Sequence, residues 1–175
     1  MVFTRILNIG CGDETYGTDF VDLYPSRKEV IKCNVDEEKL PYPDETFDEV
    51  YSRNLFEHLT NPLFMLKECF RVLKKGGKLV LFTDNAACVY FHINLFGNFG
   101  KEHYGGHKGK GTEDKHYALF TPEHLKNWME KAGFKDVRTE YYNPYSKRIR
   151  TVIKKILQKV SKKYFSLHIK VIATK

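Results

Sequence analysis

Arg5-Ile-Leu-Asn-Ile-Gly-Cys-Gly12 is the stretch that decides the fold of this chain. Its apolar residues are long enough for one buried strand of a parallel sheet, and two glycines follow at once. A strand that ends in Gly-x-Gly turns sharply and is expected to leave backbone N–H groups open to a ligand. The same pattern is also typical of an ordinary strand-to-turn junction, so its meaning depends on the residues that follow.

An acidic residue lies ten positions after Gly12, within the apolar run Phe20-Val-Asp-Leu23. A carboxylate at the tip of a neighbouring strand can accept hydrogen bonds from both hydroxyls of a ribose. The third glycine of the dinucleotide fingerprint is absent, because its position holds Thr15, and no Gly-Lys-Ser/Thr ending of a P-loop follows. The pattern therefore indicates a nucleoside ligand without a pyrophosphate, of which S-adenosylmethionine is the common example.

Length and composition favour one α/β domain covering residues 1–175. The chain is 42% hydrophobic and 14% aromatic, which is enough for a substantial core. It has no apolar run of membrane-spanning length and no signal-peptide pattern, and its four cysteines form no CxxC pair. The spacing of His103, His107 and His116 matches no zinc signature. We therefore expect a reduced, cytoplasmic protein with no metal site.

Apolar runs alternate with helical patterns along the chain, which predicts a mostly parallel sheet. Strands are expected at residues 6–9, 20–23, 29–35, 48–52, 78–83, 134–142 and 167–173. Only seven residues separate Gly12 from Phe20. A helical crossover needs about ten to twelve residues, so the first helix is expected to be missing or reduced to a single turn.

Two helices have clear start and stop signals. Asn61-Pro62 supplies an N-cap residue and a first-turn proline, and Gly76-Gly77 is expected to stop that helix. Thr121-Pro122 starts a second helix, which is expected to stop at Gly133. Between the two helices, residues 84–120 are irregular and rich in glycine and aromatic residues. A loop of this length is predicted to act as a lid or binding loop.

Residues 145–164 are predicted to form a basic amphipathic helix, whose apolar face would carry Ile149, Val152, Ile153, Ile156, Leu157 and Val160. Residues 146–163 hold eight Lys or Arg and no acid, so most of the net charge of +7 is concentrated there. The apolar stripe is expected to be buried, against the edge of the sheet or against a second copy in a homodimer. The basic face is then either simply solvated or a contact for an anionic membrane or nucleic acid.

Four further patterns occur together with the glycine stretch. They are Leu40-Pro-Tyr-Pro-Asp-Glu-Thr-Phe-Asp48, Asn54-Leu-Phe-Glu-His-Leu59, Leu73-Lys-Lys-Gly-Gly-Lys-Leu79 and His116-Tyr-Ala-Leu-Phe-Thr-Pro-Glu-His-Leu125. In this order they resemble the class I S-adenosylmethionine-dependent methyltransferases, especially the small UbiE-like (methyltransferase type 11) family. The resemblance implies a Rossmann-like seven-stranded sheet of order 3-2-1-4-5-7-6, with the last strand antiparallel and S-adenosylmethionine as the cofactor.

The resemblance also assigns roles to individual positions. It places Gly10, Cys11 and Gly12 at the methionine part of the cofactor and Asp22 at the ribose. Val35 and Asp36 would reach the adenine, and Ser52, Arg53 and Asn54 would line the pocket after the fourth strand. Asn8 departs from the family pattern, because an acid usually stands two residues before the first glycine. An amide still forms hydrogen bonds there but offers no charge.

The implied activity is methyl transfer to a small-molecule or glycan-like acceptor. Such a reaction mainly needs alignment of donor and acceptor, and a general base only where the acceptor is protonated. Glu57, His58 and His116 are the candidate catalytic residues. Two alternatives remain open at this stage. Asn8 and the missing helix favour a non-catalytic binding module, whereas the basic segment alone favours an RNA methyltransferase.

Overall fold

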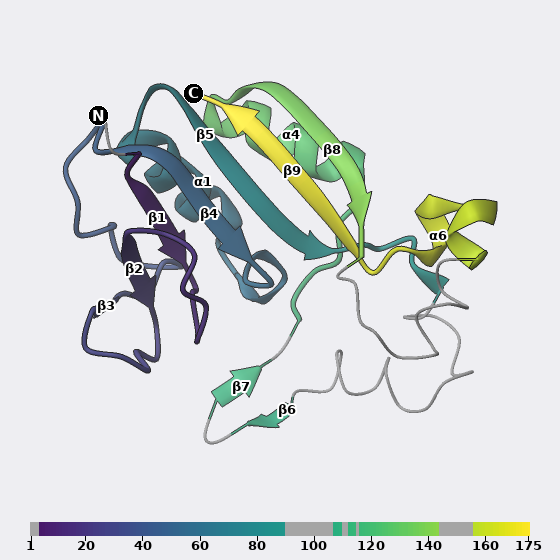
Figure 1. The fold of residues 1–175 in the computed structure, drawn as a ribbon, viewed down its shortest axis with the longest axis horizontal. Helices are drawn as coiled ribbons and strands as arrows, with labels where there is room; N and C mark the ends of the chain where they lie inside the picture. The colour runs from purple at the N-terminus through teal and green to yellow at the C-terminus, as the bar shows by residue number, and fades with distance from the viewer. Residues whose placement is uncertain (1–3, 90–106, 110–111, 115, 144–155) are drawn as a thin grey trace.

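A computed structural model describes residues 4–89, 107–109, 112–114, 116–143 and 156–175. Its main sheet has the strand order β3-β2-β1-β4-β5-β9-β8 (Figure 1). The strands are β1 Ile6–Ile9, β2 Asp19–Asp22, β3 Val30–Lys32, β4 Phe47–Arg53, β5 Leu73–Asp84, β8 Lys135–Tyr142 and β9 His168–Thr174. β9 runs antiparallel to both of its neighbours, and the β3-to-β5 pairs are parallel. The predicted fold class and strand order are confirmed.

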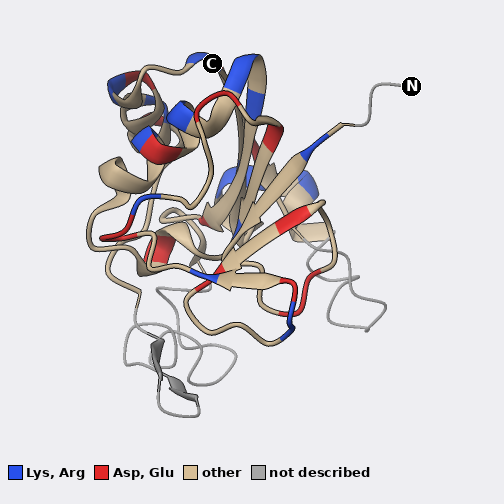
Figure 2. Ribbon diagram, turned by 90° about the vertical axis from the view of Figure 1, so that its left-hand side faces the viewer, with Lys and Arg blue, Asp and Glu red and all other residues tan. Residues whose placement is uncertain are grey.

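Two helices pack on the same face of this sheet, α1 (Pro62–Val72) and α4 (Pro122–Ala132) (Figures 1 and 2). Their inward side chains are fully buried with those of the central strands and form one hydrophobic core. The ends of α4 follow the sequence signals. The Thr121 hydroxyl accepts a hydrogen bond from the His124 N–H, and Gly133 ends the helix in the left-handed region at φ +105°.

The end of α1 differs from its prediction. The helix stops at Val72, and Leu73 is already extended, fully buried and paired with Phe47 of β4. Burial of Leu73 in the strand therefore ends the helix before the glycine pair is reached. Gly76 instead makes a turn inside the first part of β5, at φ +75°. The third strand, β3, is likewise shorter than expected.

The connection between β1 and β2 contains no helix, as the short spacing predicted. Residues 13–18 instead fold over the sheet face opposite α1 and α4. The Asn8 amide donates to the backbone oxygen of Tyr16 at 2.9 Å, and the Tyr16 ring packs on Tyr51 with 4.7 Å between centroids. Two further rings continue this row: the Phe82 centroid lies 5.7 Å from that of Tyr51 and 5.0 Å from that of Tyr142. Aromatic side chains therefore cover part of the surface that a first helix would have covered.

The segment predicted as a lid is described only in part. β6 (His107–Gly109) and β7 (Thr112–Asp114) form a separate two-stranded antiparallel sheet (Figure 1). Residues 90–106, 110–111 and 115 lie outside the described residues. The position of His103 and the lid function are therefore not tested.

The predicted basic helix is also described only from residue 156 onward, so Ile149, Val152 and Ile153 lie outside the described residues. Residues 156–160 are helical, and α6 (Lys162–Phe165) follows after a break at Ser161. Ile156 and Val160 are 57% and 78% exposed, so the edge of the sheet does not bury them, whereas their burial against a second copy stays a prediction. Within the described part of the chain, no helix is long and apolar enough to cross a membrane.

Candidate functional site

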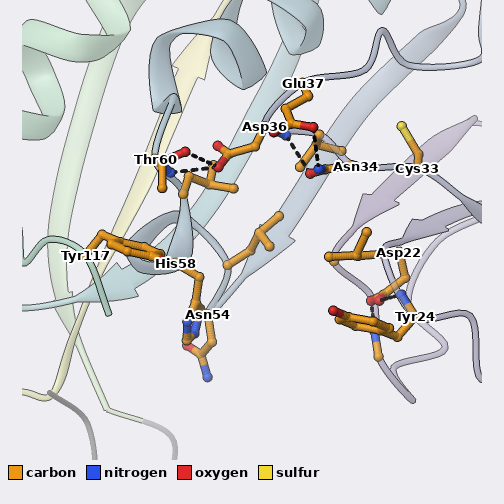
Figure 3. Close-up of a pocket in the computed structure, with 16 residues that line it drawn as sticks. Asp22, Tyr24, Cys33, Asn34, Asp36, Glu37, Asn54, His58, Thr60 and Tyr117 are labelled. Atoms are coloured by element: carbon orange, nitrogen blue, oxygen red, sulfur yellow. Dashed lines mark hydrogen bonds between the residues drawn. The ribbon is translucent and has the colours of Figure 1, made fainter. Parts of the chain in front are cut away.

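A cavity of about 510 Å³ opens at the carboxyl ends of β1, β2 and β4, beside the loop that follows β3. The strand order reverses between β1 and β4, and open α/β sheets bind ligands at such a point. In Figure 3, Asp22 and Tyr24 lie at one side of the cavity, and Asn54, His58 and Tyr117 lie at the other. Six of the residues predicted to bind the cofactor line the cavity, namely Gly10, Gly12, Asp22, Val35, Asp36 and Asn54.

The glycine loop after β1 approaches the cavity closely but does not offer its N–H groups. Gly10 and Cys11 donate to the Val21 carbonyl at 2.9 and 3.4 Å, and Gly12 donates to the Asp22 carboxylate at 2.8 Å. The expectation of open N–H groups is therefore wrong for these three residues. Gly10 is required for another reason, because it has φ +66° and a Cβ atom would lie 2.9 Å from the Leu55 side chain.

Asp22 keeps acceptor capacity on both carboxylate oxygens. One oxygen accepts the Gly12 N–H at 2.8 Å and the other accepts the Tyr24 N–H at 2.8 Å. A carboxylate offers about four lone-pair sites, so each oxygen can still accept one hydroxyl. This geometry fits the two hydroxyls of a ribose, which is the role predicted for Asp22.

Asp36 has a structural role that the sequence did not indicate. Its carboxylate accepts the Thr60 N–H at 2.8 Å, the Thr60 hydroxyl at 2.6 Å and the Asn61 N–H at 2.9 Å. These bonds attach the loop after β3 to the start of α1, and the Asn61 side chain makes no capping bond of its own. About one acceptor site remains on Asp36, so its contact with adenine stays a prediction.

Four of the predicted cofactor residues do not line the cavity. Asn8 and Ser52 are fully buried, and Cys11 is 2% exposed, where burial raises the pKa of its thiol. The Arg53 guanidinium pairs with Glu14 at 3.1 Å.

The cavity also contains residues that the sequence analysis missed, including Tyr24, Asn34, Thr60 and Tyr117. Tyr117 arrives from the far end of the long loop, where its N–H donates to the Glu57 carbonyl at 2.8 Å. A contact across 60 positions has no local sequence signal. Tyr24, by contrast, directly follows the run that carries Asp22 and could have been found from that position.

The three candidate catalytic residues lie together at the Tyr117 end of the cavity. Glu57 and His58 belong to the 3-10 helix Phe56–His58, and the rings of His58 and His116 meet edge to face with centroids 4.5 Å apart. Only His58 lines the cavity, whereas Glu57 is 1% exposed. Behind them, Asp84 at the end of β5 lies 3.0 Å from His116 Nδ1 and 3.2 Å from His168 Nδ1.

Burial and hydrogen bonding separate the two acids of this cluster. Burial alone would raise the pKa of Asp84, but the close approach of the His116 and His168 imidazoles to its carboxylate outweighs burial and holds the pKa below its usual range. Burial raises the pKa of Glu57, and the nearby Asp84 charge raises it further, although the Thr83 hydroxyl donates to its carboxylate at 2.6 Å. Asp84 therefore carries the negative charge that faces the imidazoles.

The expectation of no metal site is not tested by this structure. Three side chains, Glu57, His58 and His116, each place one potential ligand atom so that the three atoms lie within 4.8 Å of one another. A divalent cation can use such a set of donors. The activity experiment below separates this use of the cluster from proton transfer.

Replacing Asp84 with asparagine is expected to lower the free energy of unfolding by about 1–3 kcal/mol at pH 7, because two buried imidazoles lose their charged partner. A carboxylate with a lowered pKa stabilises the fold above its unfolded pKa of 3.8 and loses that contribution as the pH falls further. The difference between the parent and Asp84→Asn should therefore shrink between pH 5 and pH 3 in urea titrations. An equal difference at both pH values would contradict the charged state assigned to Asp84.

Sequence comparisons identify relatives of the chain. Residues 3–139 match the sequence model of a family described as a methyltransferase domain. The chain is 29% identical over 164 residues to the ubiquinone biosynthesis O-methyltransferase of Coxiella burnetii, covering 80% of this chain and 68% of that protein. It is 28% identical over 171 residues to the enzyme of the same name from Xanthomonas euvesicatoria, covering 83% and 70%.

Solved structures share the fold. A SAM-dependent methyltransferase from Archaeoglobus fulgidus superposes with a TM-score of 0.64 at 22% identity, covering 98% of this chain and 86% of that one. An S-adenosylmethionine-dependent methyltransferase from Mesorhizobium loti gives a TM-score of 0.66 at 18% identity, covering 98% and 90%. At these identities the likeness concerns the fold.

Proposed function

Because the chain belongs to the methyltransferase domain family and is an S-adenosylmethionine-dependent methyltransferase, we propose that it methylates a hydroxyl oxygen of a small molecule. The observation that carries this proposal is the imidazole–carboxylate cluster of His58, His116 and Asp84 at one end of the cavity. A hydroxyl group holds its proton at neutral pH, so its methylation gains from a general base. An amine with an open lone pair needs no such group.

The other end of the cavity suits the cofactor. The Asp22 carboxylate has room for two ribose hydroxyls, Gly10 lines the cavity at the β1 end, and Val35 offers an apolar contact for the adenine. When bound, S-adenosylmethionine supplies an electrophilic methyl group with a neutral leaving group. Holding the ribose at Asp22 would direct the rest of the cofactor across the cavity toward His58.

In this arrangement His58 takes the proton of the hydroxyl that is methylated, since among the described residues it is the imidazole that lines the cavity. His116 is held by Asp84 at 3.0 Å and packs edge-on against the His58 ring. Asp84 and His116 are therefore positioning residues, which fix the ring of His58 and place negative charge where an imidazolium forms. Glu57 adds a second carboxyl group, with an oxygen within 4.8 Å of a nitrogen of each of these imidazoles.

The named relatives support oxygen as the acceptor atom, because both are O-methyltransferases by name. Their identity of 28–29% does not transfer their substrate to this chain. The alternative of a non-catalytic module loses its basis, since the chain is an enzyme of this family. An RNA methyltransferase rests on the basic segment alone and is included in the test as a competing acceptor.

The proposal is tested by incubating the protein and S-adenosylmethionine with matched acceptors. The set contains catechols, simple phenols and sugars, their amine analogues, and a structured RNA, with S-adenosylhomocysteine and the methylated product measured by mass spectrometry. We expect turnover with at least one hydroxyl compound and less with its amine analogue, unchanged by EDTA. Turnover of amines or RNA only would contradict the proposal. If EDTA abolished the methylation of hydroxyl compounds and added Mg²⁺ restored it, the cluster would act as a metal site and not as a general base.

A further inference from the structure

The segment Ile156–Ser166 presents large apolar side chains to solvent beside lysines. Ile156, Val160 and Tyr164 recur every four residues and are 57%, 78% and 47% exposed. Ile156 and Val160 lie one turn apart on the helical residues 156–160, and Tyr164 lies on α6, after the break at Ser161. Exposed aliphatic groups of this size are unfavourable in water, which indicates that this surface has a partner.

The segment is held in place by amide side chains. The Asn85 amide donates to the carbonyls of Lys163 and Ser166 at 2.8 Å each. The Asn143 amide donates to the Phe165 carbonyl at 3.0 Å and accepts the Leu167 N–H at 2.7 Å. These amide hydrogen bonds hold residues 163–167, while Ile156, Val160 and Tyr164 stay exposed and available for an external contact.

The charged residues of the segment itself are all lysines, although the exposed Glu123 of α4 lies near enough to interact with Lys163. Lys159, Lys162 and Lys163 are exposed among the apolar side chains, and the chain contains no Asp or Glu after Glu140. Lys163 Nζ also lies 5.5 Å from the Tyr164 ring centroid. A second copy of the same surface would bring these lysines together, so self-association through it is electrostatically unfavourable.

We propose that the surface formed by Ile156, Lys159, Val160, Lys162, Lys163 and Tyr164 binds the headgroup region of an anionic phospholipid bilayer. Such a bilayer offers both an apolar layer for the aliphatic groups and negative charge for the lysines. Nucleic acid would match the lysines but leave Ile156 and Val160 in water. Because β9 begins directly after this segment and His168 contacts Asp84 at 3.2 Å, the bilayer would adjoin the catalytic end of the cavity.

The test measures binding of the full chain to vesicles of phosphatidylcholine containing about one-third phosphatidylglycerol, with pure phosphatidylcholine vesicles for comparison. Two double variants address the two components, Ile156→Ser with Val160→Ser and Lys159→Gln with Lys163→Gln. A matched control, Lys131→Gln with Lys135→Gln, removes the same charge from exposed positions at the opposite end of the sheet. Circular dichroism and thermal midpoints verify that all three variants fold.

We expect binding to the anionic vesicles only, a loss of about tenfold in each surface variant, and less than a twofold change in the control. No binding of the parent to anionic vesicles, or an equal loss in the control, would overturn the proposal. If the parent bound a single-stranded RNA more tightly than the anionic vesicles, and only the lysine variant weakened that binding, the surface would be assigned to nucleic acid instead. A parent dimer that the Ile156→Ser, Val160→Ser variant dissociates would assign it to a second copy.

Discussion

Replacing His58 with glutamine is expected to lower kcat by about 10²- to 10⁴-fold, the contribution typical of a positioned general base. Glutamine keeps a similar length and a hydrogen-bonding end but cannot take up a proton at neutral pH. His58 lines the cavity from the 3-10 helix, at the end opposite Asp22 (Figure 3). The cofactor Kd should therefore stay within about threefold of the parent value while the chemical step slows. Initial rates and calorimetric binding on the same preparation measure the two effects.

The matched control is His124→Gln, which removes an exposed imidazole from the first turn of α4. It should leave kcat and the free energy of unfolding unchanged. Asp84→Asn should also lower kcat, and the rate of that variant should depend differently on pH, since Asp84 acts through His116. If His58→Gln retained the parent kcat, the base would have to be another group and the role given to the cluster would be wrong.

Replacing Asp22 with alanine is expected to weaken S-adenosylmethionine binding by about 1–3 kcal/mol, which is roughly 5- to 150-fold. The alanine removes the two acceptor oxygens proposed for the ribose hydroxyls. It also frees the N–H groups of Gly12 and Tyr24, so part of the loss will come from a looser glycine loop. Asp22→Asn keeps one acceptor oxygen and should give an intermediate affinity.

Asp136→Asn is the control for this series. Asp136 is an exposed acid on β8, at the edge of the sheet farthest from β2, and asparagine tolerates its φ of +50°. Cofactor affinity should not change in this variant. An Asp22→Ala protein that binds the cofactor as tightly as the parent would remove Asp22 from the cofactor site.

The sheet could be predicted because its signals are local. Buried strands give continuous apolar runs such as Ile6–Ile9, and the short connection to β2 excludes a crossover helix by length alone. The resemblance then supplied the strand order, including the antiparallel β9. Asp22, Gly10 and His58 could be singled out for the same reason, since each lies within a recognisable motif.

The features that could not be predicted depend on distant contacts. The glycine loop gives its N–H groups to Val21 and Asp22, and α1 ends early because Leu73 pairs with Phe47. Likewise, Ile156 and Val160 have the spacing of a buried stripe, but the sheet edge of their own chain does not cover them. Periodicity identifies a face of a helix but does not show what covers it.

The central claim is that the cavity between Asp22 and His58 holds the cofactor, and a crystal structure of the protein with S-adenosylhomocysteine tests it most directly. We expect both ribose hydroxyls within hydrogen-bonding distance of the Asp22 carboxylate, the adenine beside Val35, and the sulfur end directed toward His58. Ligand density outside this cavity, or a ribose that does not contact Asp22, would contradict it.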